Sequence, residues 1–164
     1  MSRAHVREVD GDEPEDLPEL PLSPHPNYVT ARGLAALQTR REQIEADIAT
    51  IADDAADRRQ RRAALDRELR WLKARIAAAQ LVAGGARSTA KIAFGAEVTV
   101  VDEDNSEFRY RIVGEDEADP EAGLISWTSP LARALIGLKI GDIAVWPRPA
   151  GDCEVEIIAI AYPA

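Results

Sequence analysis

The stretch of sequence that decides the fold covers residues 30–83 and reads TARGLAALQTRREQIEADIATIADDAADRRQRRAALDRELRWLKARIAAAQLVA. Its apolar residues follow a heptad repeat, and it holds no proline and no glycine after Gly33, so the pattern predicts helix. The a positions are Leu34, Arg41, Ile48, Ala55, Arg62, Leu69, Ile76 and Ala83. The d positions are Leu37, Ile44, Ile51, Arg58, Leu65, Leu72 and Ala79. A stripe this narrow must pack against a second helix.

Two architectures provide that second helix. In one, the chain reverses near residues 53–57 and the two halves pair as an antiparallel hairpin; in the other, one long helix pairs with a second copy. The unbroken heptad favours the dimer. Arg58 and Arg62 favour the hairpin, because consecutive core arginines are tolerated better where helices separate at a tip than inside a tight coil. Asp53 or Asp54 would cap the second helix. The hairpin is the preferred prediction.

The composition of the chain limits its class. With 164 residues, the protein is long enough for one compact domain and an appendage. No apolar run reaches the length of a membrane span, and residues 1–13 carry charges where a signal peptide has an apolar core. These features predict a cytoplasmic protein without a membrane partner.

The net charge of −9 is distributed unevenly. Residues 1–27 are acidic and rich in proline, which predicts a disordered leader. The arm at residues 28–83 is basic, residues 84–91 contain glycines typical of a linker, and residues 92–164 are acidic. This separation suggests different surfaces for different partners.

The C-terminal part has a different pattern, typical of β-structure. Ser129, Pro130 and Gly137 have the positions of a helix cap, a first helical residue and a helix stop, with Leu131, Leu135 and Ile136 as the apolar face. Strands are expected at Glu97–Val101, Phe108–Val113, Leu124–Thr128, Ile143–Trp146 and Cys153–Ala161. The predicted fold class is therefore α+β, with a helical hairpin followed by an antiparallel sheet of about five strands and one short helix.

The predicted tip of the arm carries the one candidate metal site. Asp53, Asp54 and Asp57 lie within about one helical turn, and clustered carboxylates suit a magnesium ion when another protein completes the ligand shell. The alternative is structural, because acids followed by arginines at i, i+4 also stabilise a helix. The sequence shows no catalytic triad, phosphate-binding loop or zinc cluster, which argues against an enzyme acting alone.

Several motifs resemble one known family. They are Ser129–Gly137 (SPLARALIG) with Lys139, Gly141 and Asp142, together with Phe94–Ala96, Arg111–Gly114, Asp116–Glu117 and Tyr28–Thr30. Together they resemble the bacterial transcript-cleavage factors GreA and GreB over nearly everything from Tyr28 onward. The run Leu69–Leu72 (LRWL) is more similar to GreB.

The resemblance implies an antiparallel coiled coil, an FKBP-like C-terminal domain and RNA polymerase as the partner of a monomer. The partner-binding residues would be Thr128, Ser129, Pro130, Leu131 and Arg133. The arm would enter the secondary channel, with the tip acids helping the polymerase to hold magnesium and cleave backtracked RNA, so that the chain needs no cofactor of its own. The basic residues near the tip would face nascent RNA or DNA; they are Arg58, Arg59, Arg61 and Arg62.

Two departures from the family pattern keep alternatives open. The tip motif Gly-Asp-x-Ser-Glu-Asn-Ala is absent, and each helix is about two turns shorter, which would withdraw the tip by about 11 Å. A regulator that occupies the channel without stimulating cleavage is therefore the main alternative. A prolyl isomerase is a weaker one, because its aromatic pocket would have to be built from Phe94, Phe108, Tyr110, Trp127 and Trp146.

Overall fold

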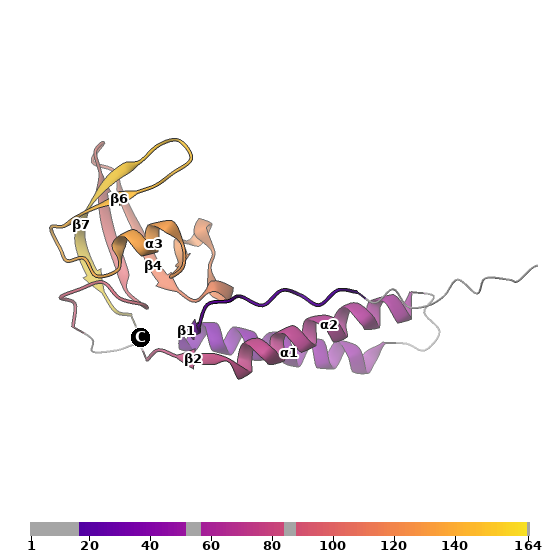
Figure 1. Cartoon of the computed structure of the whole chain (residues 1–164). Helices are drawn as coiled ribbons and strands as arrows, with labels where there is room; N and C mark the ends of the chain where they lie inside the picture. The colour runs from indigo at the N-terminus through magenta and orange to yellow at the C-terminus, as the bar shows by residue number, and fades with distance from the viewer. Residues whose placement is uncertain (1–16, 52–56, 84–87, 164) are drawn as a thin grey trace, which may run out of the picture.

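The computed structural model describes residues 17–51, 57–83 and 88–163. A helical arm projects from one side of a β-sheet domain, and the segment before the arm runs along it (Figure 1). Within the described ranges, no helix is both long enough and apolar enough to cross a bilayer. The predicted domain limits at residues 28–83, 84–91 and 92–164 remain predictions.

The arm consists of helices α1, Ala31–Thr50, and α2, Arg58–Ala77. Thr30 starts α1, because its side-chain oxygen accepts a hydrogen bond from the Gly33 N–H at 3.0 Å. Each helix has 20 residues and is about 30 Å long. The heptad stretch predicted two helices of about 25 residues, each roughly 37 Å long.

The shortfall arises partly at the base of the arm. The sequence predicted helix up to Ala83, but α2 ends at Ala77. The next residues form strand β2, Ala79–Leu81, which pairs in parallel with β1, Asn27–Val29. This pairing takes the backbone out of the helix before the glycines that were expected to stop it.

The predicted seam packs α1 against α2 (Figure 1). Leu37, Ile44 and Leu72 are buried between the helices. Partly buried residues extend this cluster; they are Ile48, Leu65, Leu69, Trp71 and Ile76. An ion pair also crosses the helices, with Arg40 Nε 2.7 Å from Glu68 Oε1. The hairpin prediction is confirmed, since the heptad stripe of each half is covered by the other half.

The second part of the fold is a five-stranded sheet in the order β5-β4-β3-β7-β6. Its strands are β3 (Glu97–Asp102), β4 (Glu107–Val113), β5 (Leu124–Ser126), β6 (Ile143–Trp146) and β7 (Cys153–Ala161). The short helix α3, Pro130–Leu135, packs onto the core of this sheet. All five predicted strands and the helix are present, and the α+β class is confirmed.

One strand pair differs from the predicted antiparallel sheet. β4 and β5 are parallel, with Arg111 opposite Leu124 and Val113 opposite Ser126. Parallel neighbours need a crossover connection rather than a tight turn. Two short 3-10 turns provide it, η1 at Glu115–Glu117 and η2 at Pro120–Ala122. The sheet is therefore mixed, and the turn η1 is carried toward the base of the arm.

The arm and the sheet domain are joined through η1. Arg75 of α2 has only 4% of its side chain exposed and donates to Asp116 Oδ2 at 2.7 Å and to Asn27 Oδ1 at 2.7 Å. The Thr30 hydroxyl donates to Glu117 Oε2 at 2.5 Å. The base of the arm is thus fixed to the domain by buried polar contacts as well as by packing.

The segment before β1 also has defined contacts. The Trp71 Nε1–H donates to the carbonyl of Pro21 at 3.1 Å, and the Ser23 hydroxyl donates to Glu115 Oε1 at 3.0 Å. The sequence predicted a disordered leader over residues 1–27. Its described part, residues 17–27, instead lies against the arm and the domain, because prolines restrict this stretch and its polar groups find partners. Residues 1–16 lie outside the described ranges.

Candidate docking surface and arm tip

The residues predicted to bind a partner lie at the corner between β5 and α3. The Ser129 hydroxyl accepts a hydrogen bond from the Ala132 N–H at 3.3 Å and so caps α3. Pro130 follows at the first helical position. A backbone N–H at that position has no partner within the helix, so proline loses no hydrogen bond there. The hydroxyls of Ser126 and Thr128 lie 2.7 Å apart. The corner is therefore shaped by its own hydrogen bonds, before any partner arrives.

The residues predicted to bind a partner differ in solvent exposure. Pro130 and Arg133 are exposed, and Thr128 and Ser129 are half-buried. Leu131 is only 4% exposed and belongs to the core of the sheet domain. Leu131 therefore packs under α3 and supports the shape of the corner, and its contact with a partner remains a prediction.

Sequence reasoning missed apolar side chains that lie exposed beyond α3. The helix ends at Leu135, so Ile136, expected on its buried face, is the C-cap and is 39% exposed. Further along the chain, Ile140 is 57% exposed, Ile143 60% and Val145 49%. Gly137 could have predicted the exposure of Ile136, because a helix that stops at this glycine leaves the preceding residue outside its last turn. These residues add exposed apolar surface to the C-terminal part of the chain.

The acids predicted at the tip are only partly within the described residues. Asp53 and Asp54 lie outside them. Asp57 holds the N-cap position of α2, is exposed and makes no side-chain capping hydrogen bond. Across the described ranges, no group of three or more His, Cys, Asp or Glu side chains is arranged to hold a metal ion. The magnesium site at Asp53, Asp54 and Asp57 therefore remains a prediction.

The arginines predicted to face nucleic acid occupy the first turns of α2. Arg59, Arg61 and Arg62 are exposed, and Arg58 is half-buried. Arg62 also pairs with Asp66, with 3.0 Å between Nε and Oδ2. An exposed pair of this kind is weak in water, so it leaves the guanidinium available to a stronger anion.

The basic residues nearer the base of α2 bind acids of other segments of the chain. Arg70 binds both carboxylate oxygens of Glu19, and Arg75 binds Asp116. The hydrogen bond from Arg70 lowers the pKa of the Glu19 carboxyl, and the same bond raises the pKa of Arg70. The basic surface that the sequence predicted along α2 is thus concentrated toward the tip.

The aromatic side chains do not form one pocket. Ring contacts join Phe108, Tyr110 and Trp146 in one group, where burial raises the pKa of Tyr110. Different contacts join Tyr28 to Phe94 and to Trp127 at the arm junction. A prolyl isomerase needs such rings around one substrate cavity, and this separation does not favour that alternative.

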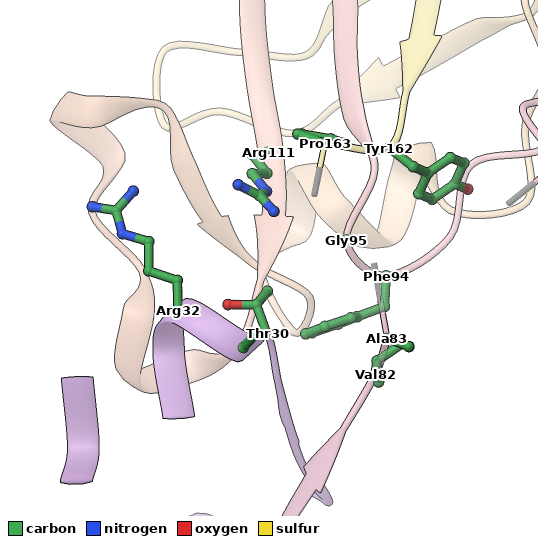
Figure 2. A pocket seen from close by; sticks show the side chains of 10 residues that line it. Thr30, Arg32, Val82, Ala83, Phe94, Gly95, Arg111, Tyr162 and Pro163 are labelled. Carbon is green, nitrogen blue, oxygen red and sulfur yellow. The ribbon is translucent and has the colours of Figure 1, made fainter. Parts of the chain in front are cut away.

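A small cavity lies at the arm junction (Figure 2). Thr30 and Arg32 from the start of α1 line it together with Phe94, Arg111 and Tyr162. The Arg111 Nε is buried and has no hydrogen-bond partner among the described residues. The cavity holds about 50 Å³, well below the roughly 300 Å³ at which ligand pockets begin. It offers no room for a peptide substrate.

The C-terminal part of the chain matches a protein-family model. The model is described as "Transcription elongation factor, GreA/GreB, C-term" and matches residues 87–162. Among curated proteins, transcription elongation factor GreA of Thioalkalivibrio sulfidiphilus is 38% identical over 138 residues, covering 80% of this chain and 82% of the relative. GreA of Methylobacterium sp. strain 4-46 is 36% identical over 151 residues, covering 82% and 96%. These relatives are named GreA, so the predicted leaning toward GreB is not confirmed.

Solved structures give matches of lower similarity. A GreA/GreB factor from Nitrosomonas europaea is 22% identical with a TM-score of 0.42, covering 83% of this chain and 99% of that chain. GreA factor homolog 1 of Thermus thermophilus is 21% identical with a TM-score of 0.41, covering 84% and 99%.

Proposed function

The chain belongs to the GreA/GreB family of transcription elongation factors, and on this basis we propose that it binds RNA polymerase and regulates elongation from the secondary channel. The observation that carries the proposal is the 38% identity over 138 residues, because a match of that length includes the arm as well as the sheet domain. In this proposal the polymerase remains the enzyme, and the chain changes what its active site does.

The corner between β5 and α3 is the proposed docking surface. Pro130 stands exposed on a helix start that Ser129 caps, so the contact surface needs little ordering when it binds. Preorganisation of this kind supports affinity, because less conformational entropy is lost on association. The exposed Ile136 and Ile140 would enlarge the contact with apolar area.

The arm is the part that would enter the channel. Its tip half carries Arg58, Arg59, Arg61 and Arg62, which suits a passage containing RNA. In a cleavage factor, Asp53, Asp54 and Asp57 would supply carboxylate oxygens to a magnesium ion shared with the polymerase, and the bound metal would activate the attacking water. Hard oxygen donors are the right chemistry for magnesium.

Arm length supports a second candidate function. If the family's active arms are two turns longer, an arm about 30 Å long ends about 11 Å short of the position that their tips reach. That gap is much larger than a metal-ligand distance of about 2 Å. The chain would then occupy the channel and regulate the polymerase without stimulating cleavage.

RNA cleavage in purified, backtracked polymerase complexes tests both functions. Binding is measured in parallel, and the variants are Asp53→Ala, Asp54→Ala and Asp57→Ala. Stimulated cleavage that the Ala variants lose supports the metal-assisting tip. Binding without cleavage supports the channel-occupying regulator. A chain that fails to bind polymerase at all contradicts the proposal.

A further inference from the structure

Residues 17–26 lie along one face of α2 and are held there by side chains of the helix (Figure 1). Arg70 donates to Glu19 from Nη2 at 2.6 Å and from Nε at 3.0 and 3.2 Å. One residue further along α2, the Trp71 indole donates to Pro21 at 3.1 Å. A forked contact of this kind fixes direction as well as distance, so the segment has a defined path on the helix.

A third contact lies nearer the tip. Arg67 Nη1 donates to the carbonyl of Pro18 at 3.4 Å. Positions 67, 70 and 71 are three and four residues apart, so their side chains share one face of α2. The segment therefore follows a single line of the helix and continues directly into β1, where Asn27 binds Arg75.

The other contacts of the segment are with the sheet domain. The Ser23 hydroxyl donates to Glu115 Oε1 at 3.0 Å, and Glu115 belongs to η1. His25 packs edge-on against Trp127, with 5.7 Å between ring centroids. The segment thus bridges the outer part of α2 and the sheet domain, which among the described residues are otherwise joined at the base of the arm.

The composition of the segment suits this role. Its prolines are Pro18, Pro21, Pro24 and Pro26. Each fixes one backbone torsion, so less conformational entropy is lost when the segment is held in place. A proline also lacks an N–H, and an exposed segment rich in proline has fewer donors that need a partner.

The position of the contacts determines what they do. Arg75 and Thr30 attach the arm to η1 at its base, so these contacts act close to the point about which the arm would turn. The contacts at Arg67 and Arg70 lie farther out, with Arg67 about 12 Å along the helix from Arg75. A second attachment at a distance restricts the direction of the arm. Without it, a rotation of about 10° would move the end of a 30 Å arm by about 5 Å.

We propose that residues 17–26 form a strap that fixes the direction of the arm relative to the sheet domain, with Glu19 as a positioning residue. Its consequence for transcription rests on the proposed function, because a docked domain aims the arm into the channel only if their angle is fixed. The strap itself is a property of the free protein and can be tested without polymerase.

The test is a distance distribution between two nitroxide labels, measured by pulsed electron resonance. The labels are attached at Gln60→Cys on α2 and Glu103→Cys in the β3–β4 turn, in the full chain with Cys153→Ala. The parent is expected to give one narrow distribution. Glu19→Arg should broaden it several-fold, because two like charges then meet at the strap. Adding Arg70→Glu should restore the narrow distribution by rebuilding the pair with reversed charges.

The controls separate the strap from general damage. Leu22→Ala alters a strap residue that is 55% exposed, and it should leave the width unchanged. The double variant Glu19→Ala and Ser23→Ala removes one contact at each end without adding charge, and it should also broaden the distribution. A double variant as narrow as the parent overturns the proposal. So does a charge reversal that fails to restore the width lost in Glu19→Arg.

Discussion

Arg75 and Asp116 form a nearly buried ion pair, with 2.7 Å between Arg75 Nε and Asp116 Oδ2, that links the last turn of α2 to the crossover of the sheet domain. Their side chains are 4% and 19% exposed. Asn27 completes the site by accepting from Arg75 Nη2 and donating to the Arg75 carbonyl. One guanidinium thus connects β1, α2 and η1.

Replacing Arg75 by Met should destabilise the protein strongly. The change keeps much of the side-chain volume but leaves the Asp116 carboxylate and the Asn27 Oδ1 without their donor. Loss of one member of a buried pair costs about 3–5 kcal/mol. The 19% exposure of Asp116 places the expected loss at the lower end. Urea denaturation measures it. Arg40→Met is the matched control, since its pair with Glu68 is exposed and worth less than about 1 kcal/mol. Equal losses in both variants would contradict this account.

Gly114→Ala should loosen the arm junction. The φ of Gly114 is −68°, which any residue adopts, so the substitution tests space alone. An added Cβ would overlap the Tyr28 carbonyl oxygen, and backbone atoms must then move, at a cost of about 1–3 kcal/mol.

Gly33→Ala is the contrasting variant at the same junction. There the added Cβ would meet Glu117 Oε2 at 2.7 Å, the end of a side chain that can rotate away at the cost of its hydrogen bond from Thr30. Alanine also favours the helix by roughly 1 kcal/mol. Thermal unfolding should therefore show a clear loss for Gly114→Ala and a small change for Gly33→Ala. A larger loss of stability for Gly33→Ala than for Gly114→Ala would contradict the proposed backbone contact between Gly114 and Tyr28.

Pro130→Glu should weaken binding to RNA polymerase while preserving the fold. A glutamate is accepted in the first turn of a helix, so α3 should still form, but the apolar contact is replaced by a charge. A loss of at least about tenfold in affinity is expected, which corresponds to about 1.4 kcal/mol. Pro147→Glu, an exposed proline after β6, is the matched control and should bind normally. Full affinity in Pro130→Glu would exclude this corner as the docking surface.

Acid should release the strap. The hydrogen bond from Arg70 to the strap residue Glu19 lowers the pKa of the Glu19 carboxyl, and the charge of Arg67 also lowers it. A carboxyl whose pKa is lowered by a contact stabilises that contact above its ordinary pKa, and the effect is lost as the pH falls through the lowered value. Acidification should therefore shift the Trp71 indole N–H signal in NMR spectra, because that group binds the strap at Pro21. Glu19→Gln should remove this pH dependence. An unchanged dependence in that variant would assign it to another group.

Much of the fold was predictable because the deciding signals are local. The heptad at Leu37, Ile44 and Leu72 gave the seam, and the Ser129–Pro130 pair gave the start of α3. Alternation and turn residues placed β6 and β7 at their observed limits. Each of these depends on side chains within a few positions of one another.

The features that the sequence did not predict depend on distant pairing. The end of α2 at Ala77 is set by β1, about fifty residues away along the chain. The parallel direction of β5 follows from the crossover through η1, which no short pattern marks. The attachment of residues 17–26 depends on Arg70 and Trp71. In the candidate site, Leu131 was predicted both on the apolar face of the helix and among the partner-binding residues, and its side chain lies in the core.

The parallel pairing of β1 with β2 has a consequence for how the arm opens. β1 leads into α1 and β2 follows α2, so their ladder, with Asn27 opposite Ala79 and Val29 opposite Leu81, closes the base of the hairpin. Thermal separation of the two helices must then begin at the far end and proceed inward. Amide hydrogen exchange should be fastest in the turns next to Thr50 and Arg58 and slowest beside Leu72. The local stability of the arm therefore decreases from its base toward its tip, the end that would first meet RNA.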